Sequence, residues 1–205
     1  MNLDRAKALK VFRKVKQVRE EIAAYCLSHD RSVLPVEDYQ RIVAQMYLLE
    51  IEKVEVAFEG TFLRGLVERY PHRARIIVQK NQGEDWKRFT AVKELCHLVN
   101  DEQEDWSIDG VHTIKEMLLE YHVDSSRPGL AEVVTQSEIF AEIAAVELLY
   151  PFSQRKLDVV SMVEDPSFTF AKIAGYHKLP EYFVDLALTP WYHKMTMDLW
   201  NCVDD

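Results

Sequence analysis

Cysteine and glycine are scarce in this chain of 205 residues. Its three cysteines, Cys26, Cys96 and Cys202, are odd in number and widely spaced, and no two of them form a C-x-x-C pair, so they make a poor disulfide framework. Six glycines and seven prolines indicate regular elements joined by short connections. Because 48% of the residues are hydrophobic and 29% charged, the composition is that of a folded globular protein and excludes a disordered or fibrous chain.

Long hydrophobic runs and an excess of basic residues are missing too. No apolar run approaches the roughly 18 residues that a membrane span needs. The first residues, MNLDRAKALKVFRKVK, lack the apolar core of a secretory signal. We therefore expect a cytoplasmic protein with no membrane partner. The 25 basic and 34 acidic residues give a net charge of −9, which disfavours direct binding of nucleic acid.

The few basic residues are concentrated at one end of the chain. Residues 1–19 hold seven of the 25 basic residues and one of the 34 acidic residues, so this segment carries +6 and the remainder −15. Apolar residues recur there at spacings of three and four from Ala8 to Tyr25, which predicts an amphipathic helix. We expect this basic helical arm, residues 1–30, to lie against the acidic body. Dimerisation through the apolar stripe, or contact of the basic face with an acidic partner or nucleic acid, is the alternative.

The rest of the chain predicts an α+β protein, mostly helical with a small antiparallel sheet. A helix is expected after Pro35, and a second from Glu84 to the acidic stretch 101–105. Three strand-like runs lie between these two helices, at 53–58, 61–69 and 74–79. Further helices are expected at 111–121, 130–150, 154–163, 167–175 and 181–188, with a loop at 124–129.

The segment from Arg88 to Leu98 is the one that carries chemistry. On a helix, Lys93 and His97 lie one turn apart on the same face, with Glu94 beside them. This is the geometry of an H-E-x-x-H zinc site, in which two histidines hold the metal and the glutamate takes a proton from the metal-bound water. Here lysine stands at the first position. A Lys, a Glu and a His at this spacing are, by themselves, typical of a solvated helix surface.

The flanking residues strengthen the interpretation of this segment as a site. The run from Arg88-Phe89-Thr90 to His97-Leu98 resembles R-F-T-x-A-H-E-L-G-H-L of the ImmA/IrrE metallopeptidase family, with Lys93 for the first histidine and Cys96 for glycine. A second block, from Glu138 to Pro151, resembles the family's E-x-x-A-N-x-F-A-A-E-L-L-M-P, with Glu142 in place of asparagine. Softer likeness at 63–65, 74–78 and 170–188 extends the resemblance over roughly 35–188.

The resemblance implies a zincin-like metallopeptidase fold over residues 31–190, between the basic arm and a C-terminal tail at 191–205. It implies Glu94 as general base, His97 as a zinc ligand and Glu138 as the carboxylate ligand. Family members act on helix-turn-helix repressors in prophage, mobile-element and stress control, so it also implies a repressor-like protein partner. The binding groove would lie between the helix of Glu94 and the helix of Glu138.

Lys93 conflicts with the zinc chemistry of the family. An ammonium group has three donors and no lone pair, and removing its proton at pH 7 costs about 4.6 kcal/mol. We therefore expect zinc, the family's cofactor, to be absent or weakly bound. We hypothesise that the Lys93 ammonium takes the place of zinc between Glu94 and Glu138. The alternative is that Lys93 extends to solvent and the site has decayed.

Other residues offer little to replace the missing histidine. Cys96 lies toward the apolar face of its helix, and His112 and His122 flank the next helix. Three functions remain open. The chain is a peptidase-like regulatory binding protein without standard zinc catalysis, an active zinc metallopeptidase with an altered ligand set, or a structural, oligomerising protein that uses its N-terminal helix.

Overall fold

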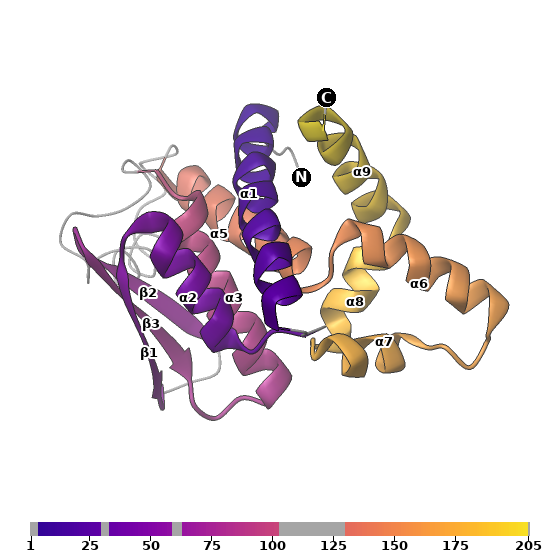
Figure 1. Cartoon of the computed structure of the whole chain (residues 1–205), viewed down its shortest axis with the longest axis horizontal. Helices are drawn as coiled ribbons and strands as arrows, with labels where there is room; N and C mark the ends of the chain where they lie inside the picture. Colours follow the sequence, from indigo (N-terminus) through magenta and orange to yellow (C-terminus); the bar gives the residue numbers. More distant parts are fainter. Residues whose placement is uncertain (1–3, 30–32, 59–62, 103–129, 205) are drawn as a thin grey trace.

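The structure is a computed structural model that describes residues 4–29, 33–58, 63–102 and 130–204, with side chains from residue 136 in the last range. The elements follow the predicted α+β pattern, with many helices and one small sheet (Figure 1). The predicted helix at 111–121 and the loop at 124–129 lie outside the described residues. Within the described residues, no helix combines the length and the apolar character that crossing a membrane requires.

The sheet has three strands in the order β1-β3-β2 and is mixed, so the expectation of an antiparallel sheet was wrong. β2 (Gly65–Arg69) and β3 (Arg73–Gln79) are antiparallel because a tight turn at Tyr70–His72 reverses the chain between them. β1 (Glu50–Val56) pairs with the other edge of β3, in parallel. The chain therefore crosses from one edge of the sheet to the other before it forms the central strand.

The helices form a layer beside the sheet and an extension away from it, as Figure 1 shows. Their bounds are α1 (Arg5–His29), α2 (Val36–Tyr47), α3 (Glu84–Asn100), α5 (Leu130–Leu149), α6 (Phe152–Glu164), α7 (Phe170–His177), α8 (Glu181–Leu188) and α9 (Pro190–Asp204). The predicted tail at 191–205 is thus mostly the helix α9. Proline suits its first turn, where a missing amide proton costs no hydrogen bond, and Tyr192 and Trp200 are buried.

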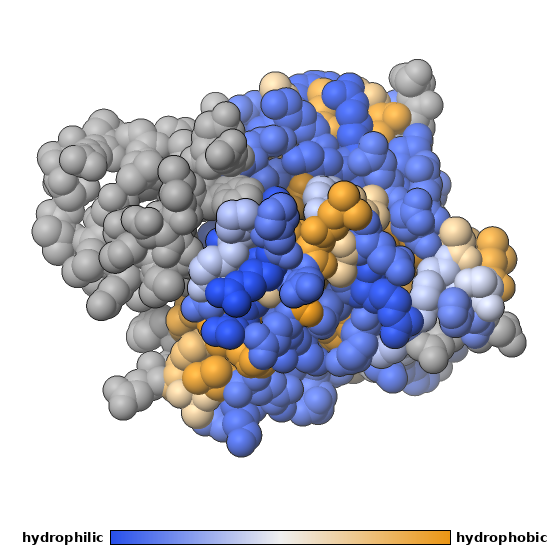
Figure 2. Space-filling view, turned by 60° about the vertical axis from the view of Figure 1, so that its left-hand side comes forward, coloured by the Kyte–Doolittle hydropathy of each residue, from blue (hydrophilic) through white to orange (hydrophobic). Residues whose placement is uncertain are grey.

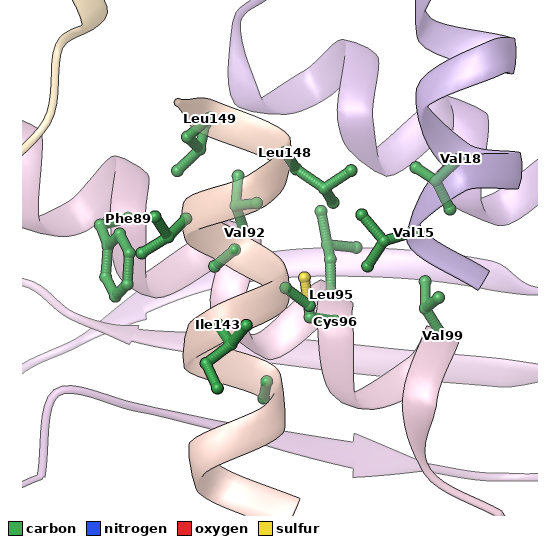
Figure 3. Close-up of a cluster of buried hydrophobic side chains, with 14 of the residues drawn as sticks. Val15, Val18, Phe89, Val92, Leu95, Cys96, Val99, Ile143, Leu148 and Leu149 are labelled. Atoms are coloured by element: carbon green, nitrogen blue, oxygen red, sulfur yellow. The ribbon is translucent and has the colours of Figure 1, made fainter. Parts of the chain in front are cut away.

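The core is built around α3, which contacts α5, α2, the sheet and α1. Figure 3 shows Val15 of α1 beside Leu95 of α3 and Leu148 of α5. The apolar stripe of α1 is buried from Ala8 to Val18, so it packs on its own chain as expected. On the basic face, Lys14 Nζ lies 2.8 Å from Glu102 Oε1 of the acidic body. The face brought forward in Figure 2 is mostly hydrophilic, with small separate apolar groups.

A buried ion pair joins α5, α6 and α9, and nothing in the sequence pattern predicted it. The side chains of Glu147 and Arg155 are fully buried, and Arg155 Nη2 donates to Glu147 Oε1 at 2.6 Å. Arg155 also donates to the Tyr150 carbonyl and to Thr196 Oγ1, while Trp200 Nε1 donates to Glu147 Oε2. Because both carboxylate oxygens have donors, the charges are well compensated in this dry environment.

We predict that Glu147→Gln destabilises the protein by about 3 kcal/mol, because it leaves the Arg155 charge buried without a counterion. Urea unfolding of the purified chain, followed by circular dichroism, measures this loss. Glu20→Gln, an exposed position on α1, is the control and should leave the unfolding midpoint unchanged. Equal midpoints for the two variants would contradict the prediction.

Candidate functional site

The residues singled out on α3 come together with the second motif block on α5. Glu94 and His97 are buried and Lys93 is mostly buried. Lys93 and His97 both contact Glu138 in the N-terminal half of α5, and Glu94 contacts Lys93. Gly65 at the start of β2 allows the strand to approach closely. A Cβ there would clash with Thr90 Cγ2 and would meet Glu94 Oε1 at 3.0 Å. The strand thus covers the Glu94 side of the site.

Lys93 forms the ion pair that the sequence analysis hypothesised. Its Nζ lies 2.6 Å from Glu138 Oε2 and 3.2 Å from Glu94 Oε1, so the ammonium sits between the two carboxylates. Its side chain is 18% exposed, so it does not extend into solvent. Burial disfavours its charged form, but the charges of Glu94 and Glu138 outweigh burial and hold the pKa of Lys93 above its ordinary value. The group therefore stays an ammonium.

His97 is held by a carboxylate at each ring nitrogen. Nδ1 lies 2.9 Å from Asp101 Oδ2, and Nε2 lies 3.2 Å from Glu138 Oε1. Burial opposes protonation, yet the contacts with Asp101 and Glu138 outweigh it and raise the pKa of His97 to about 10. Ser137 Oγ donates to Asp101 Oδ1 at 2.8 Å and so fixes that carboxylate. At neutral pH the ring is an imidazolium, which has no lone pair for a ligand.

Glu138 connects the two cations. One carboxylate oxygen meets Lys93 and the other meets His97, so neither oxygen is free of a cationic neighbour. Burial raises its pKa, but the His97 contact and the Lys93 charge prevail and hold the pKa of Glu138 well below its usual range. Its side chain is nevertheless 44% exposed, so this carboxylate is the part of the site that solvent and a partner can reach.

Glu142 lies one helical turn beyond Glu138, where the motif of the second block has asparagine. It is half-buried, and burial together with the Glu138 charge raises its pKa, although the Lys93 charge opposes this. The site therefore gathers more carboxylates than cations. Asp101, Ser137 and Gly65 were not predicted as parts of the site. The spacing of four residues from His97 to Asp101 on one helix face is the signal that could have identified the first of them.

These residues do not fit a zinc ion. The position of the first ligand holds an ammonium, and both remaining ligands implied by the motif are bound by other charged groups. Among the residues that the structure describes, no group of three or more His, Cys, Asp or Glu side chains is arranged to hold a metal. Cys96 faces the core, where burial raises the pKa of its thiol well above its ordinary value. His112 and His122 lie outside the described residues.

The groove expected between α3 and α5 would lie at the border of a direct contact between these helices. The two helices pack directly against each other through apolar side chains, as Figure 3 shows around Val92 and Ile143. Lys93 and His97 add polar contacts to Glu138 of α5. A cavity of about 330 Å³ lies elsewhere, at the beginning of β1 and β3, lined by Glu50, Glu52, Tyr70, Arg73 and Arg75 among others.

Comparison of the chain with models of known protein families gives no match, and comparison with curated proteins gives none either.

We predict that Lys93→Met destabilises the fold by about 2 kcal/mol, because it leaves Glu94 as a buried carboxylate without a cation. In the double variant Lys93→Met/Glu94→Gln the buried charge is gone, so most of the stability should return. Urea unfolding of the two single variants and the double variant gives the coupling between the residues. Lys87→Met is the control on the same helix, where the lysine pairs with Glu55 and Glu84, and it should cost less. Additive effects of the two substitutions would contradict a direct Lys93–Glu94 pair.

Proposed function

We propose that this protein is a metallopeptidase-like regulatory protein that acts by binding a protein partner and does not cleave it. The observation that supports this proposal is the position of Lys93 Nζ, 2.6 Å from the carboxylate that the motif assigns to zinc. In this proposal the fold is that of a zincin-like peptidase, and the ammonium of Lys93 takes the place of the metal.

The chemistry of the site supports binding over hydrolysis. Peptide hydrolysis by a zinc enzyme needs a metal that lowers the pKa of a bound water and polarises the substrate carbonyl. An ammonium can donate hydrogen bonds, but it cannot coordinate and activate a water in this way. Glu94, the residue that would act as base, is buried and lies 3.2 Å from that ammonium. The negative charge of Glu94 is paired with the Lys93 ammonium.

The exposed part of the site favours a partner with a basic segment. Glu138 is 44% exposed, Glu142 is half-buried beside it, and the whole chain carries −9. Complementary charge steers association and disfavours partners of the same sign. A helix-turn-helix repressor, the partner class implied by the motif, offers basic residues on the surface that contacts DNA phosphates.

We predict that Lys93→His makes the chain bind zinc with a stoichiometry near one, since it adds a third ligand beside His97 and Glu138. The wild-type protein should retain less than about one tenth of an equivalent, because a lysine ammonium cannot ligate. Untagged proteins are dialysed against zinc and then against buffer, and the bound metal is measured by inductively coupled plasma mass spectrometry. Lys87→His is the matched control, because it places a new histidine on the same helix next to Glu84 and Glu55. It should gain no zinc.

Stoichiometric zinc in the wild-type protein that is lost in Glu138→Ala would overturn the proposal in favour of an active peptidase. Failure of Lys93→His to gain zinc would contradict the proposal that the Lys93 ammonium takes the place of the metal. The same proteins are then incubated with zinc and unfolded casein. Cleavage by wild type, abolished by Glu94→Gln, would also overturn the proposal.

A further inference from the structure

The outward face of the sheet carries charged residues at the beginning of β1 and β3. The helices α2 and α3 contact the sheet on its other face, where alternate residues of β3 are buried (Figure 1). The parallel register of β1 and β3 places Glu50 beside Arg73 and Glu52 beside Arg75. All four residues are exposed, because successive side chains of a strand point to opposite faces of the sheet. Two pairs of opposite charge are therefore expected side by side on this face.

The pair of Arg75 and Glu52 is formed. Arg75 Nε lies 3.0 Å from Glu52 Oε2, and Arg75 Nη1 lies 3.5 Å from Glu68 Oε2 on β2. The guanidinium of Arg75 thus has a carboxylate on each neighbouring strand, and its charge is balanced within the sheet.

Arg73 contacts an aromatic ring and leaves the second pair open. Its Cζ lies 4.6 Å from the centroid of the Tyr70 ring, so the guanidinium packs on the face of that ring. Within the described part of the chain, Arg73 forms no ion pair with an acidic side chain, and Glu50 forms none with a basic one. One cation and one anion on neighbouring strands therefore remain without a charged partner.

The cavity of about 330 Å³ at this end of the sheet has both unpaired groups in its lining. Glu52, Tyr70 and Arg75 line it as well, so the charged lining consists of two carboxylates and two guanidinium groups. This balance disfavours a ligand with a high net charge of either sign. The volume is near the lower limit of about 300 Å³ for small-molecule sites. The cavity therefore suits a small molecule that carries one positive and one negative group.

We propose that this cavity binds a free α-amino acid, with the ligand carboxylate at Arg73 and the ligand ammonium at Glu50. A guanidinium offers two parallel N–H donors to a carboxylate, and a carboxylate accepts hydrogen bonds from an ammonium group. The ring of Tyr70 holds the Arg73 guanidinium before the ligand arrives, which lowers the entropy lost on binding. An α-amino acid has both charged groups on one carbon atom, so it reaches both side chains within a small volume.

The cavity is separate from the site on α3 and α5. Gly65, where β2 covers Glu94, pairs with Val78 near the end of β3, whereas the cavity lies at the beginning of that strand. The cavity shares no residue with the Lys93 site, so this inference does not depend on the proposed function.

Thermal unfolding and calorimetric titration of the full-length chain test the proposal. Each standard L-amino acid is added at about 10 mM, and the one that raises the Tm most is then titrated to obtain its Kd. We expect a Kd on the order of 1 mM and a rise of about 3 °C at about ten times the Kd. Arg73→Met and Glu50→Gln should each increase the Kd about ten-fold or more, because each removes one charged contact. Lys80→Met is the matched control, since Lys80 is an exposed cation directly after β3, and it should leave the Kd unchanged.

Two analogues of the same amino acid assign its charged groups, with NMR chemical shifts of the Tyr70 ring reporting weak binding. The N-acetyl derivative lacks the ammonium and the amide lacks the carboxylate, so each should bind wild type about ten-fold more weakly. Glu50→Gln should not weaken the N-acetyl derivative further, and Arg73→Met should not weaken the amide further. Circular dichroism confirms that each variant is folded. No Tm shift with any amino acid, unchanged affinity in either site variant, an analogue that binds as tightly as the amino acid, or a loss of affinity in Lys80→Met would each overturn the proposal.

Discussion

The arrangement of α3 and α5 depends on one cation placed between carboxylates of both helices. The two helices also pack against each other through buried apolar side chains. The short contact of Lys93 with Glu138 favours one relative position of α3 and α5, because the ammonium must reach Glu94 on its own helix and Glu138 on the other. His97 contacts the second oxygen of Glu138 through Nε2 and contacts Asp101 through Nδ1, so the positions of these three side chains depend on one another. Removing the Lys93 charge would leave the buried carboxylate of Glu94 without its cation.

A second buried pair acts at the other end of α5. Glu138 lies in the first half of this helix and Glu147 near its end, and each receives cations from a different neighbouring element. The first links α5 to α3, and the second links it to α6 and α9. The helix is therefore fixed at two points along an otherwise apolar surface. The Glu147 pair thereby helps to hold the C-terminal helices α6 and α9 on the core.

The sequence predicted those features that depend on local pattern. The apolar face and acidic first turn of α3, the proline before α2 and the proline that ends α5 each gave a helix close to the observed bounds. The pairing of Lys93 with Glu138 was predictable because the motif that these segments resemble relates the two positions. The neighbours of β1 were not predictable, since alternation within a strand says nothing about which strand lies beside it. Arg155 was missed for a similar reason, because a lone arginine in a helical segment resembles a solvated surface residue until its buried partner is known.

The two cations of the site can be considered together by the charge that they supply. Lys93 and the protonated His97 together supply two positive charges to the carboxylates of Glu94 and Glu138. A divalent ion would supply the same two charges from outside. The charges that balance the two acids are encoded in the chain and arrive with folding. Each of these ion pairs is therefore formed by residues of the chain itself.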